Sequence, residues 1–535
     1  MGKIRQRVLM AVAFLLFLLP AAAQPRKFFP DDPIQAVPPP MPVQAVRTRN
    51  LDEIVDFVLN STRPSPKPPK PAGEVNTLGE VPDNAWFTNR HARHRLSKEE
   101  LERGAGTGNS PVPPFIVVSG KTEGISPGFR MRDANGRLYF VKGDPLSNPE
   151  MATGAELIVS KFLWAIGYNI PEDYLVYARL SDFRLADDAT TTGSEGRARK
   201  MVWRDFEKIV NSFPHYSDSS FRLLASLSVP GEPVGPFRYE GTRSDDPNDI
   251  VRHEDRRDLR GLFVVAAWLN HTDMKANNSL DTVVEEEGIR FIKHYLLDFG
   301  SALGSDGDRP KDARFGHEFM IPYPADALWK MIGAGAISPA WERAKFPHLE
   351  AAGHIEAETF DPEQWKTDYP NPAFLSRLPD DEYWGAKQVM AFTNDDIWTI
   401  VKLGQFSDPR VAQYLTATLQ ARRDKIGRAF FSKVLPLDHF AVEHGELRFE
   451  DLAVTCGFRP AQQYSVSWSR FDNATGRHEP LQAGTLQLPS EAVQASEDAY
   501  FAAVLKPAAP SPQTVTVYVR KQHGAFAVVG IERTW

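Results

Sequence analysis

One cysteine, Cys456, occurs among the 535 residues of this chain. A single cysteine excludes an internal disulfide framework and any zinc site built on several cysteines, and we expect it to be a small buried core residue. Positive charge is also scarce, because 62 lysines and arginines face 69 acidic residues and give a formal net charge of −7. Domains that bind nucleic acid are usually basic, so the composition predicts no nucleic-acid partner.

Long apolar runs are absent after the first 23 residues. The longest that remains, Gly261 to Leu269, is far shorter than the ~20 apolar residues that cross a bilayer, so we expect no membrane span in the mature chain. Residues 1–23 combine a basic start, the apolar run Val8 to Leu19 and the small residues Ala21 to Ala23. This layout predicts a cleaved signal peptide and a secreted or periplasmic protein, with an uncleaved anchor as the alternative.

Residues 24–75 form a proline-rich leader, which favours an extended spacer over a packed core. One short amphipathic segment interrupts the leader. Helical periodicity places five apolar residues on one face: Leu51, Ile54, Val55, Val58 and Leu59. We expect this helix to begin after Asn50 as its cap and to dock onto the body of the protein through that apolar face.

Residues 76–180 are predicted to form an N-terminal extension and a small lobe. The glycine-rich stretch Gly120 to Gly128 precedes a hairpin that Asn135-Gly136 indicates, and the strand after this turn ends in Lys142. An apolar stripe over residues 149–167 then predicts a helix. The order of these elements predicts a few strands followed by one helix.

Two further regions complete the predicted organisation. Residues 181–434 form a mainly helical large lobe, in which the segment 180–250 is rich in loops. Its helices are expected at residues 256–270, 323–335, 394–404 and 408–433. Residues 435–535 contain short alternating strands and are predicted to form a separate β-sandwich.

The most informative motif begins at His271 and reads His-x-Asp-x-Lys-x-x-Asn, which fixes the spacing of Asp273, Lys275 and Asn278. Twenty residues after Asn278 stands Asp298-Phe299-Gly300. Phosphoryl transfer requires a carboxylate to orient the attacking hydroxyl, and a carboxamide and a second carboxylate to hold a divalent metal on the phosphates. The motif supplies this set and places Lys275 to neutralise the moving phosphoryl group, so it predicts a phosphotransferase site.

Lys142 is expected to hold the α- and β-phosphates, oriented by a glutamate from the helix that follows it. At 100° per residue Glu156 flanks the apolar stripe of that helix, whereas Glu150 lies nearly opposite. We therefore prefer Glu156 as the partner and expect Glu150 to be solvated. Gly120 and Gly124 are the expected backbone contacts to the phosphates.

Some neighbouring residues have competing interpretations. Asn277 is an alternative metal ligand, but the fifth residue after Asp273 suits the required reach better. His271 is expected to pack within the loop rather than to take part in the chemistry. Asp306 and Asp308 lie in a glycine-rich charged loop and are expected to be solvated.

Lys142, Glu156, the motif from His271 to Asn278, and Asp298-Phe299-Gly300 stand in the order found in the protein-kinase-like superfamily, which this chain resembles. The likeness is closer to divergent branches (bacterial persistence-toxin, spore-coat and secretory-pathway kinases) than to eukaryotic signalling kinases. The resemblance implies a two-lobed α+β fold, here followed by the all-β sandwich, with ATP and Mg²⁺ or Mn²⁺ as cofactors. It also implies that Lys142 binds phosphates, Asp273 acts as the base, and Asn278 and Asp298 hold the metal.

The chain departs from the family pattern at three places. The glycines stand at 120, 124 and 128 rather than as Gly-x-Gly-x-x-Gly. Thr272 replaces the arginine usual before the catalytic Asp, which argues against activation by a phosphorylated loop. No Ala-Pro-Glu follows Gly300, so the acceptor need not be a protein.

The leading hypothesis is an exported, metal- and ATP-dependent phosphotransferase that acts on a protein or envelope glycan hydroxyl. Little ATP is available outside the cytoplasm, so a catalytically silent kinase-like protein that binds nucleotide or partners is a second hypothesis. The third is an adhesion or carbohydrate-binding protein whose β domain presents aromatics such as Trp468 or Trp535. Nucleotidyl transfer also remains open, since the same fold can present ATP reversed.

Overall fold

The computed structural model describes residues 26–62, 68–120, 127–192, 197–321, 339–482 and 484–535. The predicted signal peptide, the helix predicted at 323–335 and Gly124 lie outside these residues. In the described part of the chain, no helix combines the length and apolar character needed to cross a membrane.

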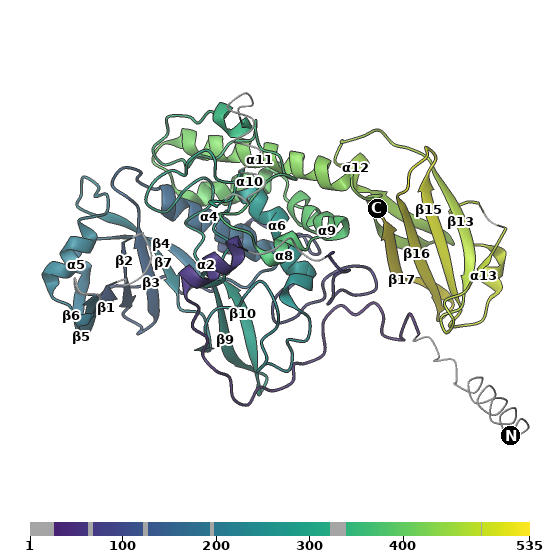
Figure 1. Ribbon diagram of the computed structural model, residues 1–535, viewed down its shortest axis with the longest axis horizontal. Coiled ribbons are helices and arrows are strands. Elements are labelled where there is room, and N and C mark those ends of the chain that lie inside the picture. The colour runs from purple at the N-terminus through teal and green to yellow at the C-terminus, as the bar shows by residue number, and fades with distance from the viewer. Residues whose placement is uncertain (1–25, 63–67, 121–126, 193–196, 322–338, 483) are drawn as a thin grey trace, which may run out of the picture. The chain divides into compact units, whose positions relative to one another are not determined.

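Contacts between residues divide the chain into two compact units (Figure 1). The larger unit comprises residues 35–75 and 81–433, and the smaller one comprises the chain up to Ile34, Asn76–Glu80 and Val434–Trp535. The fold is of the mixed α+β class, with one large mixed sheet and several antiparallel sheets.

A seven-stranded sheet forms the first part of the larger unit, in the order β4-β7-β3-β2-β1-β5-β6. Its strands are β1 (Phe115–Gly120), β2 (Gly128–Arg132), β3 (Leu138–Gly143), β4 (Asp173–Ala178), β5 (Phe183–Thr192), β6 (Ala198–Lys200) and β7 (Phe221–Leu227). The β1–β5 pair is parallel and the other pairs are antiparallel. The predicted hairpin at Asn135-Gly136 is confirmed, since β2 and β3 pair across it with Gly128 opposite Lys142.

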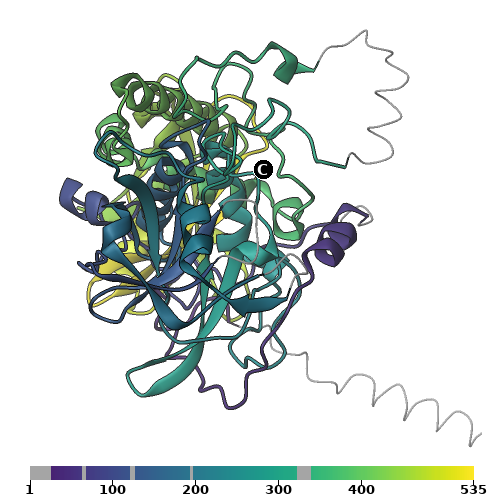
Figure 2. The same ribbon diagram turned by 90° about the vertical axis from the view of Figure 1, so that its left-hand side faces the viewer.

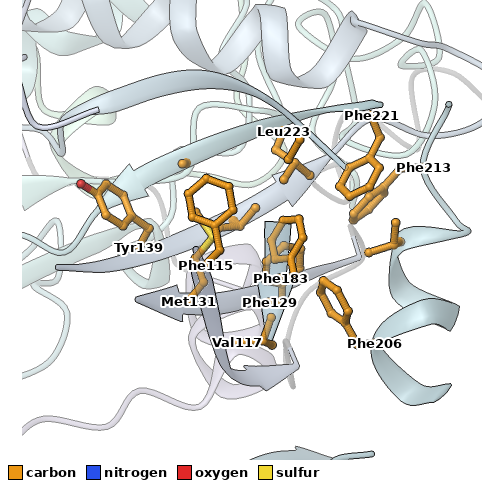
Figure 3. Close-up of a cluster of buried hydrophobic side chains, with 14 of the residues drawn as sticks. Phe115, Val117, Phe129, Met131, Tyr139, Phe183, Phe206, Phe213, Phe221 and Leu223 are labelled. Carbon is orange, nitrogen blue, oxygen red and sulfur yellow. The ribbon is translucent and has the colours of Figure 1, made fainter. Parts of the chain in front are cut away.

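One face of this sheet carries a buried aromatic core (Figure 3). Successive side chains of a strand point to opposite faces, so Tyr139 and Val141 enter this core whereas Lys142 points to the other side. Helix α5 (Trp203–Val210) contributes Phe206 to the same core. The prediction that 180–250 is rich in loops is wrong up to Leu227, because β5, β6, α5 and β7 lie there, whereas residues 228–250 contain almost no regular structure.

Helix α4 (Met151–Ile166) follows β3 and is buried on nearly every side, which confirms the helix predicted from residues 149–167. Besides the leader helix given below, the further helices that the described residues of this unit form are α3 (Lys98–Arg103), α6 (Arg257–Leu269), α8 (Pro372–Leu375), α9 (Pro379–Met390), α10 (Asn394–Val401) and α11 (Pro409–Phe431). The periodicity around 256–270, 394–404 and 408–433 therefore predicted α6, α10 and α11 correctly. Arg422 of α11 donates to the carbonyl oxygens of Ala267 and Trp268, and so satisfies the last turn of α6.

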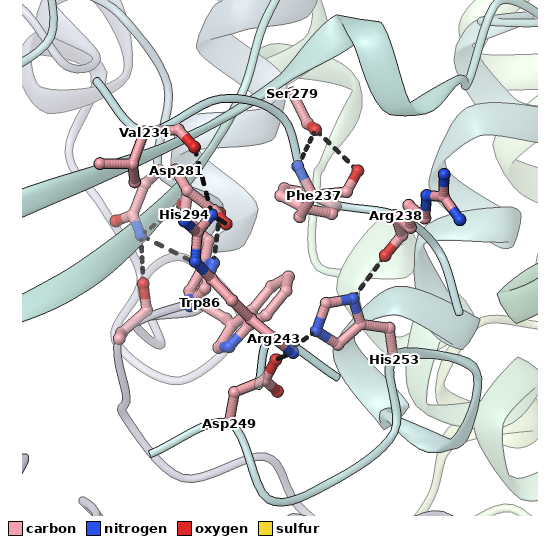
Figure 4. Close-up of polar contacts among 12 residues, drawn as sticks. Trp86, Val234, Phe237, Arg238, Arg243, Asp249, His253, Ser279, Asp281 and His294 are labelled. Carbon is pink, nitrogen blue, oxygen red and sulfur yellow. Dashed lines mark hydrogen bonds and ion pairs between the residues drawn. The ribbon is translucent and has the colours of Figure 1, made fainter. Parts of the chain in front are cut away.

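A three-stranded antiparallel sheet has the order β10-β9-β8, and its two longer strands, β9 and β10, follow α6. Its strands are β8 (Glu232–Pro233), β9 (Ser279–Glu286) and β10 (Ile289–Leu296). Asp281 on β9 lies opposite His294 on β10, accepts a hydrogen bond of 2.7 Å from His294 Nδ1, and contacts Arg243 Nη1 at 3.0 Å (Figure 4). The His294 ring stacks on Trp86 with centroids 3.5 Å apart. This buried network fixes the β9–β10 hairpin.

The smaller unit contains two antiparallel sheets, one of five strands in the order β14-β13-β15-β16-β17 and one of two strands, β11-β12. Its elements are β11 (Leu437–Glu443), β12 (Glu446–Asp451), α12 (Leu452–Thr455), β13 (Tyr464–Phe471), β14 (His478–Pro480), α13 (Ser490–Gln494), β15 (Tyr500–Pro507), β16 (Thr514–Gln522) and β17 (Ala525–Thr534). The all-β character was predicted, but the β-sandwich is not confirmed. Trp468 is a core residue, Trp535 is exposed, and Cys456 is half-buried rather than buried.

The leader is not a bare spacer. Phe28 is buried against Phe471, Tyr500 and Tyr518 on the face of the five-stranded sheet opposite its main core. Further along, helix α2 (Glu53–Ser61) forms where a helix was predicted, but Asp52 rather than Asn50 caps it. Both observations show that parts of a proline-rich segment pack against folded structure.

Candidate functional site

A pocket of about 620 Å³ in the larger unit brings together five of the residues that the sequence singles out: Lys142, Glu156, Asp273, Lys275 and Asp298. Pockets of this size accommodate small-molecule ligands. Gly120 and Asn278 are not among the described residues that line it. Its other polar lining residues include Glu53, Asp306, Arg309 and Asp368.

Lys142 is the centre of the first cluster. It is the last residue but one of β3, on the face opposite the aromatic core, and its Nζ lies 2.9 Å from Glu156 Oε1 and 2.8 Å from Asp298 Oδ1. Burial disfavours the charged ammonium, but the charges of Asp298 and Glu156 outweigh burial and raise the pKa of Lys142. Burial also raises the pKa of Glu156, and Lys142 partly offsets that increase. The ammonium is thus held in place, charged, in the lining of the pocket.

The alternative partner, Glu150, has a different role from the one predicted. It precedes α4 with φ of +69° and is buried rather than solvated. Its carboxylate accepts hydrogen bonds from the Ser407 N–H at 2.7 Å and from the Tyr216 hydroxyl at 3.0 Å. Glu150 therefore fixes the start of the helix that delivers Glu156.

Asp273 and Asn278 form the second cluster, in the loop between α6 and β9. The Asn278 Nδ2 donates to the Asp273 backbone oxygen at 2.9 Å and to Asp273 Oδ2 at 3.0 Å. The pKa of Asp273 is raised to about 6, mainly by burial; the charge of Lys275 opposes this rise and the charge of the nearby Asp368 adds to it. Since Nδ2 faces Asp273, the carboxamide oxygen of Asn278 is left as the atom able to act as a ligand.

Asp298 follows β10 after one intervening residue, Leu297, whose N–H donates to the Asn278 backbone oxygen at 2.9 Å. This bond joins the two segments that carry the predicted metal ligands. Asp298 adopts φ of +59°, a left-handed conformation that non-glycine residues rarely adopt, and 46% of its side chain is exposed. A Cβ added to Gly300 would approach Glu156 Oε2 to 3.1 Å, so glycine suits the close approach there.

Lys275 meets a residue that the sequence did not connect with it. Its Nζ lies 3.4 Å from Asp273 Oδ1 and is hydrogen-bonded to Glu53 of α2. Helix α2, drawn in purple in Figures 1 and 2, also lines the pocket with Ile54 and Phe57. Phe57 packs edge-on against Tyr369, with ring centroids 5.3 Å apart.

The predicted orientation of α2 is wrong. The exposed fractions of its apolar side chains are high: Ile54 75%, Val55 52%, Val58 48% and Leu59 53%. The buried positions are instead Asp56, Asn60 and Ser61. The polar face of α2 therefore lies towards the body, where the pocket offers charged partners such as Lys275.

Sequence reasoning missed a third group next to the loop that carries Asp273. Lys311 Nζ donates to Thr272 Oγ1 at 2.6 Å and lies 3.5 Å from both Asp368 Oδ2 and Asp306 Oδ1. Asp306 was predicted to be solvated and instead contacts this buried ammonium. His271 is buried as expected, and burial, followed by the charge of Lys311, lowers its pKa to about 4. His271 is therefore neutral at physiological pH.

No family model matches this chain, and no curated protein matches it. Among solved structures, the chain is similar to a crystal structure of the Golgi casein kinase, with 8% identity and a TM-score of 0.31, over 71% of this chain and 86% of that chain. It is also similar to the Golgi casein kinase with Mn/ADP bound, with 8% identity and a TM-score of 0.30, over 63% of this chain and 76% of that chain. Likeness at this level does not define the chemistry, which rests on the geometry of the chain itself.

Proposed function

We propose that this protein is an exported phosphotransferase of the atypical kinase type, dependent on ATP and on Mg²⁺ or Mn²⁺. The observation that supports it best is the meeting of Lys142, Glu156 and Asp298 with Asp273 and Lys275 around one pocket. A lysine held by a glutamate and a carboxylate beside a second carboxylate suits phosphoryl transfer, which depends on positioning and charge neutralisation. Export and the predicted domain boundaries rest on the sequence pattern alone.

The chain's own residues would share the work as follows. Lys142 binds phosphate oxygens, and the Asp273 carboxylate accepts the proton of the acceptor hydroxyl. The acceptor oxygen then bonds to the γ-phosphorus as the bond from that phosphorus to the β,γ-bridging oxygen breaks. Lys275 neutralises the charge on the transferred group. Asn278 and Asp298 offer the oxygen ligands that Mg²⁺ or Mn²⁺ prefers, and the cation would supply further neutralisation of the phosphates.

The acceptor is proposed to be a hydroxyl of a protein or of an envelope glycan. The proposal follows from the predicted export. Both classes of acceptor need the same proton transfer to Asp273, so the site chemistry alone does not separate them. A panel of peptides and glycans with ³²P transfer would separate them.

A thermal-melt comparison tests the site. The full-length chain and Asp298→Ala are heated with Mn²⁺ and ATP, and Asp188→Ala on the exposed surface of β5 is the matched control. A ligand at 100 times its dissociation constant stabilises a protein by about 2.7 kcal/mol, so wild type and control should shift clearly and Asp298→Ala should not. No shift in wild type with either metal would reject the proposal.

Product analysis separates the competing hypotheses. A phosphotransferase forms ADP, a nucleotidyl transferase forms pyrophosphate, and a catalytically silent kinase-like protein shows the melt shift without any product. The adhesion or carbohydrate-binding hypothesis predicts binding of glycans with no dependence on metal or nucleotide.

A further inference from the structure

The ammonium of Lys311 is one of the most deeply buried charges of the larger unit, with 1% of its side chain exposed. It contacts Thr272 Oγ1, two carboxylates at 3.5 Å and the face of Phe315 at 4.8 Å from the ring centroid. Removing an ammonium from water costs several kcal/mol, and a well-packed apolar side chain is often as stabilising as a buried ion pair. Stability alone therefore gives little reason for a cation at this position.

The backbone around Lys311 is fixed independently of its side chain. The Lys311 N–H donates to the Gly304 carbonyl oxygen at 2.8 Å, and the Lys311 carbonyl oxygen lies 2.7 Å from His354 Nδ1. Gly304 has φ of +77°, and a Cβ there would lie 2.2 Å from the His354 carbonyl carbon. These contacts make the segment a rigid support from which the ammonium reaches the catalytic loop.

Thr272, the residue that the ammonium contacts, is fully buried and immediately precedes Asp273. The Asp368 N–H donates to its carbonyl oxygen at 2.9 Å, while its hydroxyl accepts from Lys311. Asp368 also contacts Lys311 through its carboxylate and lines the same pocket as Asp273. The segments that carry Lys311 and Asp368 thus both contact Thr272, and Thr272 is the residue directly before the proposed base, Asp273.

We infer that Lys311 is a positioning residue that, through Thr272 and Asp368, holds Asp273 in its working place without any modification of this chain. The inference rests on the proposed function. Thr272 stands where related sequences are expected to carry an arginine, and Lys311 brings a buried cation to the same place from another segment. Because its carboxylate partners are Asp306 and Asp368, the pairing is complete within the unmodified chain.

The test compares three variants of the full-length chain by steady-state ATP turnover with Mn²⁺. Lys311→Met removes the cation, Thr272→Val removes only the hydroxyl that accepts from it, and Lys311→Arg restores a cation. A displacement of about 1 Å at a reacting group can cost 100-fold in rate, so we expect kcat to fall about 100-fold in the first two, with KM for ATP little changed. Lys311→Arg should recover a substantial part of the loss.

The matched control is Lys161→Met on α4. Lys161 is also buried, and its Nζ donates to the Arg103 carbonyl oxygen at 2.7 Å, away from the described lining of the pocket. The Lys161→Met variant should have a lower melting temperature and an unchanged kcat. The double variant of Lys311→Met and Thr272→Val should be no slower than either single variant, because both changes break the same contact.

Several results would overturn the inference. Lys311→Met or Thr272→Val with wild-type kcat would do so, as would a rise in KM alone or effects that multiply in the double variant. So would a wild-type chain that is active only after phosphorylation, as judged by mass spectrometry before and after phosphatase treatment. If Lys311→Met does not fold, Thr272→Val alone decides. A wild type that binds no Mn²⁺·ADP would instead remove the proposed function and the inference with it.

Discussion

Lys142 and Lys275 are both lysines of the same pocket, both contact carboxylates, and both have a raised pKa, but their partners differ. The partner of Lys142, Glu156, comes from a buried helix and has 5% of its side chain exposed. The hydrogen-bond partner of Lys275 from outside its own loop, Glu53, comes from the leader helix α2 and has 58% of its side chain exposed; Asp273 lies further from the ammonium, at 3.4 Å.

The difference matters because an exposed ion pair contributes little free energy, whereas removing one partner of a buried pair leaves a charge without compensation. The Lys142 pair therefore belongs to the framework of the site. Under the proposed function the Lys275 pair is the exchangeable one, because a phosphoryl group would replace the Glu53 carboxylate at the same ammonium.

Breaking the framework pair should have the largest effect. Lys142→Met leaves Glu156 buried without its cation, so we expect loss of about 3 kcal/mol of unfolding free energy and a fall of about 100- to 1000-fold in turnover. Chemical denaturation and steady-state assays measure both. Lys98→Met removes an exposed pair with Asp395 and is the control that should change neither. A stable Lys142→Met protein would contradict the distinction between the two lysines.

Lys275→Met should separate activity from stability. We expect a loss of about 100-fold in kcat because one cation at the transferred group is removed. The unfolding free energy should fall less than in Lys142→Met, since Glu53 is already largely in water and the contact of Lys275 with Asp273 is longer, at 3.4 Å. The same two assays apply. If this variant were as destabilised as Lys142→Met, the Lys275 pair would belong to the framework too.

Opposite responses to two Glu→Gln substitutions would sharpen the comparison. Glu53→Gln removes the carboxylate that competes for Lys275, so KM for ATP should fall by about 2- to 5-fold, the worth of an exposed pair. Glu156→Gln should instead raise KM, because Lys142 loses its fixed partner. Glu53→Asp keeps the charge and serves as the control for Glu53→Gln. A rise of KM in both Gln variants would show that Glu53 supports binding rather than competing with it.

The pH dependence should be the mildest effect. Burial raises the pKa of Asp273 to about 6 and its base form is the ionised one, so turnover should be near half-maximal at about pH 6 and should fall as pH decreases further. Lys275 has a raised pKa and stays charged across this range. His271→Asn should leave the midpoint where it is, because His271 is already neutral above about pH 4. A shift of the midpoint in this variant would show that titration of His271, rather than of Asp273, causes the loss of turnover at low pH.

The sequence predicted those parts of the site whose geometry is determined within one hairpin, one helix or one loop. Asn135-Gly136 determines a hairpin, so Lys142 falls at the end of a strand, and helical spacing distinguishes Glu156 from Glu150. The motif from Asp273 to Asn278 spans one loop, so its internal contact between those two residues follows from spacing. What these residues bind remains a prediction.

The sequence could not predict contacts between distant segments. Lys311 and Thr272 are 39 residues apart, and no motif connects them. The orientation of α2 was predicted wrongly because periodicity identifies an apolar face but not the surface that the helix meets, and here that surface is charged. Strand β5 was missed because the residues between its buried Phe183 and Ala189 mix the apolar Leu185 and Ala186 with charged side chains, so that no regular alternation appears.

The most direct measurement of the central claim is product analysis by chromatography after incubating the full-length chain with ATP and Mn²⁺. It compares wild type with Asp273→Asn, an isosteric change that removes only the proposed base. We predict ADP from wild type and at least ~100-fold less from the variant, with Mn²⁺·ADP binding retained by both. Equal ADP from both proteins, or pyrophosphate as the product, would contradict phosphoryl transfer through Asp273.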